Sequence, residues 1–196
     1  MQRGCFLFIA ILACATTATP QTPVHLGSQR FGGTSSDWGY SIATDPSGNV
    51  FVTGGFSFSA DFGGGPLVSA GARDVFRAKY APGGAHLWSQ RFGSTGYEDG
   101  RCVATDASGN VFVSGWFSGT VDFGGGPLVS ADGYDIFIAK YSPTGAHLWS
   151  QRFGDRLGDY TSEGGYGLTT DAWGNVFVSG SFTGTVDFGG GPLVSP

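Results

Sequence analysis

One stretch decides the fold of this chain: Asp106-Ala107-Ser108-Gly109-Asn110-Val111-Phe112-Val113-Ser114-Gly115, continued by Asp122-Phe123-Gly124-Gly125-Gly126-Pro127-Leu128-Val129-Ser130. It occurs once before, over 45–69, and once after, over 171–195. A flanking Ser-Gln-Arg-Phe-Gly motif also occurs three times, and its arginines (Arg30, Arg91 and Arg152) are 61 positions apart. Between Asp106 and Asp171 the spacing is 65, so the third copy carries four extra residues. A repeat of this length is typical of arrays of supersecondary units.

Each period contains four short segments rich in β-branched and aromatic residues, bounded by Gly, Pro, Asp and Ser. In the second copy these expected strands, named a to d in order, cover residues 101–105, 111–117, 135–141 and 146–153. Tight turns, Asp-Ala-Ser-Gly-Asn and Ser-Pro-Thr-Gly, join a to b and c to d. No window has a sustained helical period. The pattern predicts an all-β fold of four-stranded antiparallel β-propeller blades.

The copies predict two full blades, at 38–92 and 99–153, and a partial third at 164–196. The segment 25–31 is expected to be an orphan strand of type d. Propeller rings contain about four to eight blades, so these units predict an incomplete propeller. Further C-terminal blades or self-association would close the ring; an open arc is the third alternative.

The repeat carries a family resemblance. Residues 39–54, from Gly-Tyr-Ser-Ile-Ala-Thr-Asp to Val-Phe-Val-Thr-Gly, resemble the SBBP repeat, named for a seven-bladed β-propeller, and residues 74–80 resemble its later part. The resemblance extends over the chain from about His25 onward. It implies a propeller on exported or surface bacterial proteins. It brings no catalytic motif, cofactor or defined ligand.

The first twenty residues predict export. Arg3 precedes an apolar run over 5–13, as in a signal peptide. Signal peptidase could cut after Ala15 or Ala18. Alternatively, residues 11–14 resemble a lipobox with Cys14 as the lipid anchor, followed by a short Thr/Pro tether. Residues 1–20 are therefore assigned to the signal, and 21–196 to the repeats. Membrane association is expected only through that anchor.

Charge and recurrence limit the candidate chemistry. The net charge is −5 without a basic cluster, which argues against nucleic-acid binding. The acids in Asp-x-x-Gly-Asn and Asp-Phe-Gly-Gly-Gly recur in every copy and are interpreted as turn residues. The three histidines also share one repeat position, and Cys102 is expected to be a small buried residue. No catalytic residue, metal site or cofactor is predicted.

The ligand-binding site is expected where the sequence and length of the copies differ. The longer d–a connection adds Asp155, Asp159, Tyr160 and Glu163, which are the predicted ligand-binding residues. In a four-stranded blade the d–a and b–c connections emerge on the same face, so this connection should lie beside the long b–c connections. Long loops on a rigid scaffold often bind ligands. The leading hypothesis is an exported, non-catalytic binding or scaffolding module that contacts a surface protein or glycan. A purely structural surface repeat ranks second, and a propeller-type hydrolase or lyase third.

Overall fold

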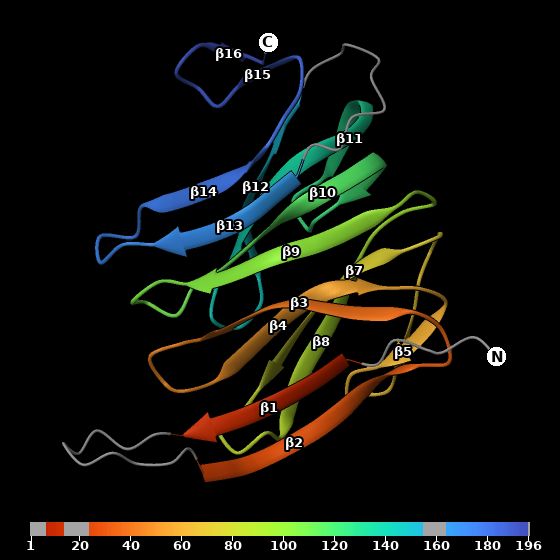
Figure 1. Ribbon diagram of the computed structural model, residues 1–196, viewed down its shortest axis with the longest axis vertical. Helices are drawn as coiled ribbons and strands as arrows, with labels where there is room; N and C mark the ends of the chain where they lie inside the picture. The colour runs from red at the N-terminus through yellow and green to blue at the C-terminus, as the bar shows by residue number, and fades with distance from the viewer. Residues whose placement is uncertain (1–6, 14–23, 155–163, 196) are drawn as a thin grey trace.

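All regular structure is β-strand in the computed structural model, which describes residues 7–13, 24–154 and 164–195 (Figure 1). The strands are β1 (Leu7–Ala13), β2 (Val24–Gly33), β3 (Asp37–Thr44), β4 (Val50–Phe56), β5 (Ser59–Asp61), β6 (Pro66–Val68), β7 (Asp74–Tyr80), β8 (His86–Phe92), β9 (Glu98–Thr105), β10 (Val111–Asp122), β11 (Pro127–Tyr141), β12 (His147–Phe153), β13 (Gly164–Thr170), β14 (Val176–Ser181), β15 (Thr185–Asp187) and β16 (Pro192–Val194).

Two four-stranded antiparallel sheets each contain one complete repeat period. The first sheet has the order β3-β4-β7-β8 and the second β9-β10-β11-β12, so both complete periods fold in the expected a-b-c-d order. A further four-stranded sheet joins β1 and β2 to the β5–β6 hairpin. A two-stranded sheet, β13-β14, follows. The a-type strands β3, β9 and β13 are adjacent, with β9 between the other two (Figure 1). The all-β prediction is confirmed, and the described residues form an incomplete propeller rather than a closed ring.

The recurring turns form as the sequence predicts. In each a–b turn the aspartate side chain accepts backbone N–H groups; Asp106 Oδ1 accepts from Ser108 and Asn110, both at 2.9 Å. Gly109 has a φ of +76°, a left-handed conformation that glycine adopts without strain. Asp45 and Asp171 hold their turns in the same way. These carboxylates therefore serve local structure.

The b–c connection differs from the expected long loop. In the first and third copies it contains a short hairpin, β5–β6 or β15–β16, and in the second copy β10 and β11 extend to form it. Asp122 Oδ1 accepts the N–H groups of Gly124 (2.7 Å) and Gly126 (3.0 Å), which closes the hairpin turn. Both glycines have φ near +105°. The sequence prediction missed this hairpin because Asp-Phe-Gly-Gly-Gly-Pro was interpreted only as a turn.

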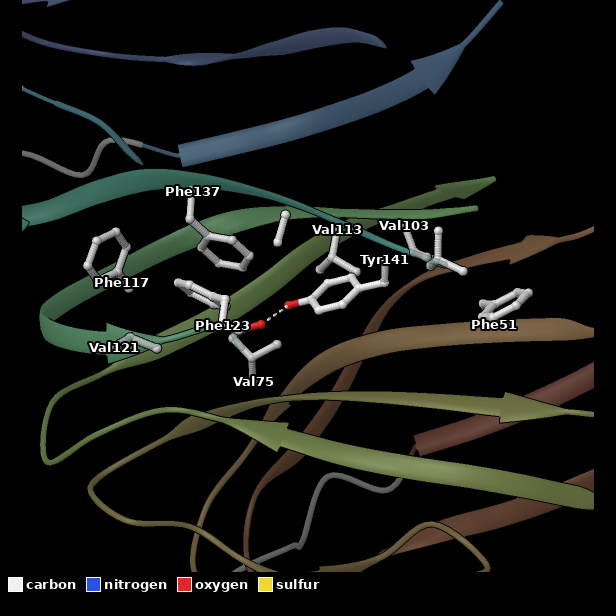
Figure 2. Packing of buried hydrophobic residues seen from close by; sticks show 11 residues of the cluster. Phe51, Val75, Val103, Val113, Phe117, Val121, Phe123, Phe137 and Tyr141 are labelled. Carbon is white, nitrogen blue, oxygen red and sulfur yellow. Dashed lines mark hydrogen bonds between the residues drawn. The ribbon is translucent and has the colours of Figure 1, made fainter. Parts of the chain in front are cut away.

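The core lies between consecutive sheets, and Figure 2 shows the larger of two buried clusters. Phe123 and Phe137 stack with ring centroids 4.2 Å apart. The Tyr141 hydroxyl donates a hydrogen bond of 3.0 Å to the Phe123 carbonyl oxygen, drawn dashed in Figure 2. Tyr80 makes the same bond to Phe62 in the first copy, at 2.9 Å. Phe62 and Phe123, which follow the hairpin aspartates of the first two copies, are thus core residues, whereas Phe188 in the third copy is exposed.

A series of threonines links the inner strands. Thr105, at the end of β9, donates its hydroxyl to the carbonyl oxygen of Thr44, at the end of β3, over 2.7 Å. Thr170, at the end of β13, donates in the same way to Thr105, over 2.9 Å. One repeat position therefore both donates to the preceding sheet and accepts from the next.

The N-terminal apolar run has a backbone partner. Residues 7–13 form β1, which pairs antiparallel with β2. The predicted orphan strand 25–31 lies within β2, which also pairs with β5 at Gly32 and Gly33. The assignment of residues 1–20 to an export signal stays a prediction.

Candidate functional site

The d–a and b–c connections meet at one end of the sheets, as the sequence predicts. The N–H of Glu98, at the start of β9, donates to the carbonyl oxygen of Arg73 over 2.9 Å. Ala72 donates to Gly96 over 3.2 Å. The a–b and c–d turns lie at the other end, where Gly48 faces the ring of Pro82. We call the first end the connection face.

A cluster of charged and aromatic residues lies at the connection face between the first and second sheets. We name it the junction cluster; its members are Trp38, Tyr40, Arg73, Asp99, Arg101, Trp116 and Tyr134. They come from the start of strands a, the end of strand b and the start of strand c. The residue type at these repeat positions differs between copies. One position is held by Trp38, Asp99 and Gly164, and another by Tyr40, Arg101 and Tyr166.

Asp99 is the centre of this cluster and is fully buried. Its Oδ2 lies 2.9 Å from Arg73 Nη1 and 3.3 Å from Arg101 Nη2. The Arg73 guanidinium lies over the Trp38 ring, with Cζ 3.7 Å from the ring centroid. Arg101 lies over Tyr40 at 4.1 Å. Each arginine therefore combines an ion pair with a cation–π contact.

Hydrogen-bonding capacity remains in the cluster. Among the described residues, Asp99 Oδ1, Arg73 Nε and Arg101 Nε are buried without a hydrogen-bond partner. Burial raises the pKa of Asp99 above its ordinary value, although both arginines act in the opposite direction. Unsatisfied buried donors and acceptors are costly, and each calls for an explanation. Unpartnered buried atoms also occur elsewhere, for example at Asp74 Oδ1 and His86 Nε2; what distinguishes this cluster is that three of them lie on residues joined by ion pairs.

A second group of acids holds the d–a connections. Glu98, fully buried, accepts hydrogen bonds of 3.1 Å from the N–H and from the hydroxyl of Ser94. Asp37 accepts the N–H of Gly33 at 2.7 Å in the preceding copy. Burial raises the pKa of Glu98 to about 7; nearby Asp74 adds to this, while the Ser94 bonds and Arg91 oppose it. These acids anchor the chain where it enters each sheet.

The predicted ligand-binding residues Asp155, Asp159, Tyr160 and Glu163, like the predicted lipid anchor Cys14, lie outside the described residues. All five assignments stay predictions. The repeat register adds that Glu163 stands at the position of Asp37 and Glu98.

The remaining recurrent residues have structural positions. The His86 and His147 rings lie against the glycines of their own hairpins: a Cβ on Gly125 would be 2.2 Å from His147 Cε1. Cys102 is half-buried rather than buried; its Sγ donates to the Tyr166 carbonyl oxygen at 2.8 Å, and burial raises the pKa of the thiol. Over the described ranges, no three His, Cys, Asp or Glu residues gather into a metal-binding group.

Sequence reasoning missed the junction cluster although a signal was present. The copies differ in residue type as well as in loop length: in the repeat alignment Trp38 corresponds to Asp99, and Arg73 corresponds to Tyr134. That Arg73 and Asp99, 26 positions apart, form an ion pair depends on how the sheets pack, which the sequence does not reveal.

Comparisons with known proteins agree with this architecture. Residues 27–54 match the SBBP family model, described as a β-propeller repeat. An uncharacterised WD repeat-containing protein of Acanthamoeba polyphaga mimivirus is 30% identical over 158 residues, covering 68% of this chain. The chain spans only 11% of that protein's length. Within the described residues, no helix is long and apolar enough to cross a membrane.

The matched segment contains β3 and the a–b turn, and the same pattern recurs in the two later copies. Residues 27–54 are therefore an SBBP β-propeller repeat, and the chain carries two later copies of the same pattern.

Proposed function

We propose that this chain is a non-catalytic β-propeller repeat module that acts as a scaffold at the cell surface and binds an acidic glycan through its connection face. The repeat scaffold is the coarser part and follows from the fold and the family. Export and ligand binding are the finer parts, and they rest on the arguments below.

The junction cluster carries the binding proposal. The recurrent turn and hairpin aspartates accept backbone N–H groups of their own turns, whereas residues that break the repeat gather here in one network of ion pairs and cation–π contacts. Two guanidiniums against one carboxylate give the cluster a local charge of +1, on a chain whose net charge is −5. Arg73 and Arg101 are partly exposed, with 20% and 27% of each side chain accessible. Guanidiniums recognise carboxylates, and aromatic rings provide apolar contact area beside them.

A glycan array with neutral and uronic-acid oligosaccharides tests this. We expect acidic oligosaccharides to bind the full chain, and Arg101→Gln to weaken that binding at least tenfold. Gln151→Ala, on the exposed outer strand of the same sheet, is the matched control and should bind normally. Equal binding of neutral and acidic glycans, or an unaffected Arg101→Gln, would reject the ligand assignment. Absence of all binding favours the alternative of a structural surface repeat.

The connection insertion is tested separately. Replacing Asp155, Asp159 and Tyr160 by alanine should reduce binding if the insertion borders the same site. Glu163→Ala should instead lower thermal stability, because its position in the repeat is that of a buried anchor. If the triple variant binds normally, the site is confined to the junction cluster.

Export rests on the N-terminal pattern and is tested independently of any ligand. N-terminal sequencing of the protein recovered from the envelope of a bacterial host should give a start after Ala15 or Ala18, or a blocked Cys14. Cys14→Ser separates the two routes, since membrane partitioning should be lost only if Cys14 is lipidated. Recovery of the intact chain in the cytoplasm would reject export.

A further inference from the structure

The strongest unexplained feature is a cavity of about 530 Å³ between the second sheet and β14. Its walls are mostly apolar and consist of Ile136, Ile138, Phe153, Val176, Val178, Ser179, Gly180, Ser181, Phe182 and Phe188. Within the described residues β14 pairs only with β13, so its other edge has no strand beside it. An apolar groove beside a free strand edge is suited to receive a further strand.

The preceding junction shows what fills such a groove. Repeat equivalents of the cavity walls, including Val75, Val113 and Phe123, line the space between the first and second sheets. There the alternate residues Phe137, Ala139 and Tyr141 of β11 occupy that space, with exposed fractions of 0–2%. Among the described residues, the position of a type c strand beside β14 is not filled.

Strand β1 has the register of a type c strand. It pairs with β2 as Phe8↔Arg30 and Ala10↔Ser28, whereas β11 pairs with β12 as Phe137↔Arg152 and Ala139↔Ser150. Both pairs have their irregularity at the same place, after Ile11 in β1 and after Lys140 in β11. The sequences agree as well, Leu7-Phe8-Ile9-Ala10 against Ile136-Phe137-Ile138-Ala139. The β1–β2 hairpin is thus half of a repeat unit, with strands c and d.

We propose that the β1–β2 hairpin of a second copy completes the β13–β14 sheet, giving a four-stranded sheet in the order β13-β14-β1-β2. The same exchange occurs in the opposite direction, because each copy has one c–d half and one a–b half. The β10–β11 register transfers directly: Val113↔Ala139 and Gly115↔Phe137 become Val178 opposite the partner's Ala10 and Gly180 opposite the partner's Phe8.

The chemistry of the groove fits this occupant. Between the first and second sheets, Arg77 lies against the Tyr141 ring, with Cζ 3.5 Å from its centroid. In the groove the equivalent of Arg77 is Ile138, and in β1 the register position of Tyr141 is held by Leu12. The cationic and aromatic residue types of one junction are thus both aliphatic residue types at the equivalent sequence positions of the other. The substitutions at the two sides are matched.

Two copies close the ring. The described residues of each copy form two complete a–d units, one c–d half and one a–b half, which is equivalent to three units, so two copies supply six. This lies within the range of four to eight blades of closed propellers. A twofold axis relates the two composite sheets, and in each of them the edge of β14 is paired with β1 of the other copy.

The inference goes beyond the proposed function and concerns the chain that retains residues 7–13. Removal of an N-terminal signal would remove β1, so ring closure by this hairpin and signal cleavage exclude each other in one molecule. The binding and export experiments do not depend on the dimer, and the experiment below uses the intact chain without a ligand.

Light scattering after size-exclusion chromatography of the full chain should give about 40.6 kDa, twice the chain mass of 20.3 kDa. Val178→Arg places a cation in the groove and should give a folded monomer. Trp173→Arg, on the β13–β14 turn, whose repeat equivalents Ser47 and Ser108 are exposed, is the matched control and should stay dimeric. A monomeric full chain, or a Val178→Arg variant that remains dimeric, overturns the proposal.

Cysteine trapping tests the register even if one variant folds poorly. With Cys5, Cys14 and Cys102 changed to serine, Ala10→Cys combined with Val178→Cys should give an intermolecular disulfide on oxidation. Directly opposed residues on paired strands have the Cα separation that a disulfide requires. Ala10→Cys combined with Phe177→Cys places the thiols on opposite faces and should not cross-link. Equal cross-linking of the two pairs, or none, would contradict the register.

Discussion

The Tyr141 hydroxyl donates a hydrogen bond to the Phe123 carbonyl oxygen, and this bond joins the end of β11 to the hairpin turn between β10 and β11. We expect Tyr141→Phe to lower the free energy of unfolding by about 1 kcal/mol, because the buried carbonyl loses its donor while the ring packing is kept. Chemical denaturation measures the change. Tyr97→Phe, at a half-exposed ring, is the control and should have little effect; equal effects would show that the bond contributes nothing.

The glycine hairpin against His147 predicts a compensating pair of substitutions. Gly125→Ala should be destabilising, since its Cβ would lie 2.2 Å from His147 Cε1. In the His147→Ala background the same change should cost much less, because the ring is gone. A double-mutant cycle on melting temperature measures the coupling. Additive effects of the two changes would rule out this steric explanation.

Glu98 predicts a pH-dependent contribution to stability. Its pKa is about 7 in the folded chain against 4.5 ordinarily, so the folded state binds the proton more tightly. The stabilisation is complete below pH 4.5 and is lost as the pH rises through 7, amounting to roughly 2–3 kcal/mol. Glu98→Gln should remove this decline. Denaturation curves between pH 4.5 and 8 test it, and an unchanged slope in the variant would refute it.

The a–b turn aspartate gives the opposite pH dependence. Burial alone would raise the pKa of Asp106, but hydrogen bonds from Asn110 and Ser108 and the charge of Lys140 lower it overall. Its stabilisation is therefore present above the ordinary pKa of 3.8 and is lost as the pH falls through the lowered folded value. Asp106→Ala should cost about 1–3 kcal/mol at neutral pH. Ser108→Ala, an exposed neighbour in the same turn, should be close to neutral.

Much of the fold could be predicted from the repeat, and the failures have physical causes. The turns were predictable because Asp and Gly act on their own backbone within a few residues. The β5–β6 hairpin was missed because its strands have only three residues each. The equivalence of β1 to a type c strand was not predicted, because it does not follow the 61-residue period. Val75 and Leu7 hold equivalent positions but are 68 positions apart. The junction cluster was missed because it depends on contacts between sheets.

The threonine links between the inner strands have a consequence for how such a chain can change in length. Thr105 supplies a hydroxyl to the sheet before it and a carbonyl to the sheet after it, so every unit carries both halves of the same joint. A whole unit can therefore be duplicated or deleted without leaving an unmatched joint at the cut. Unequal recombination between copies would then yield arrays of different length that fold by the same contacts.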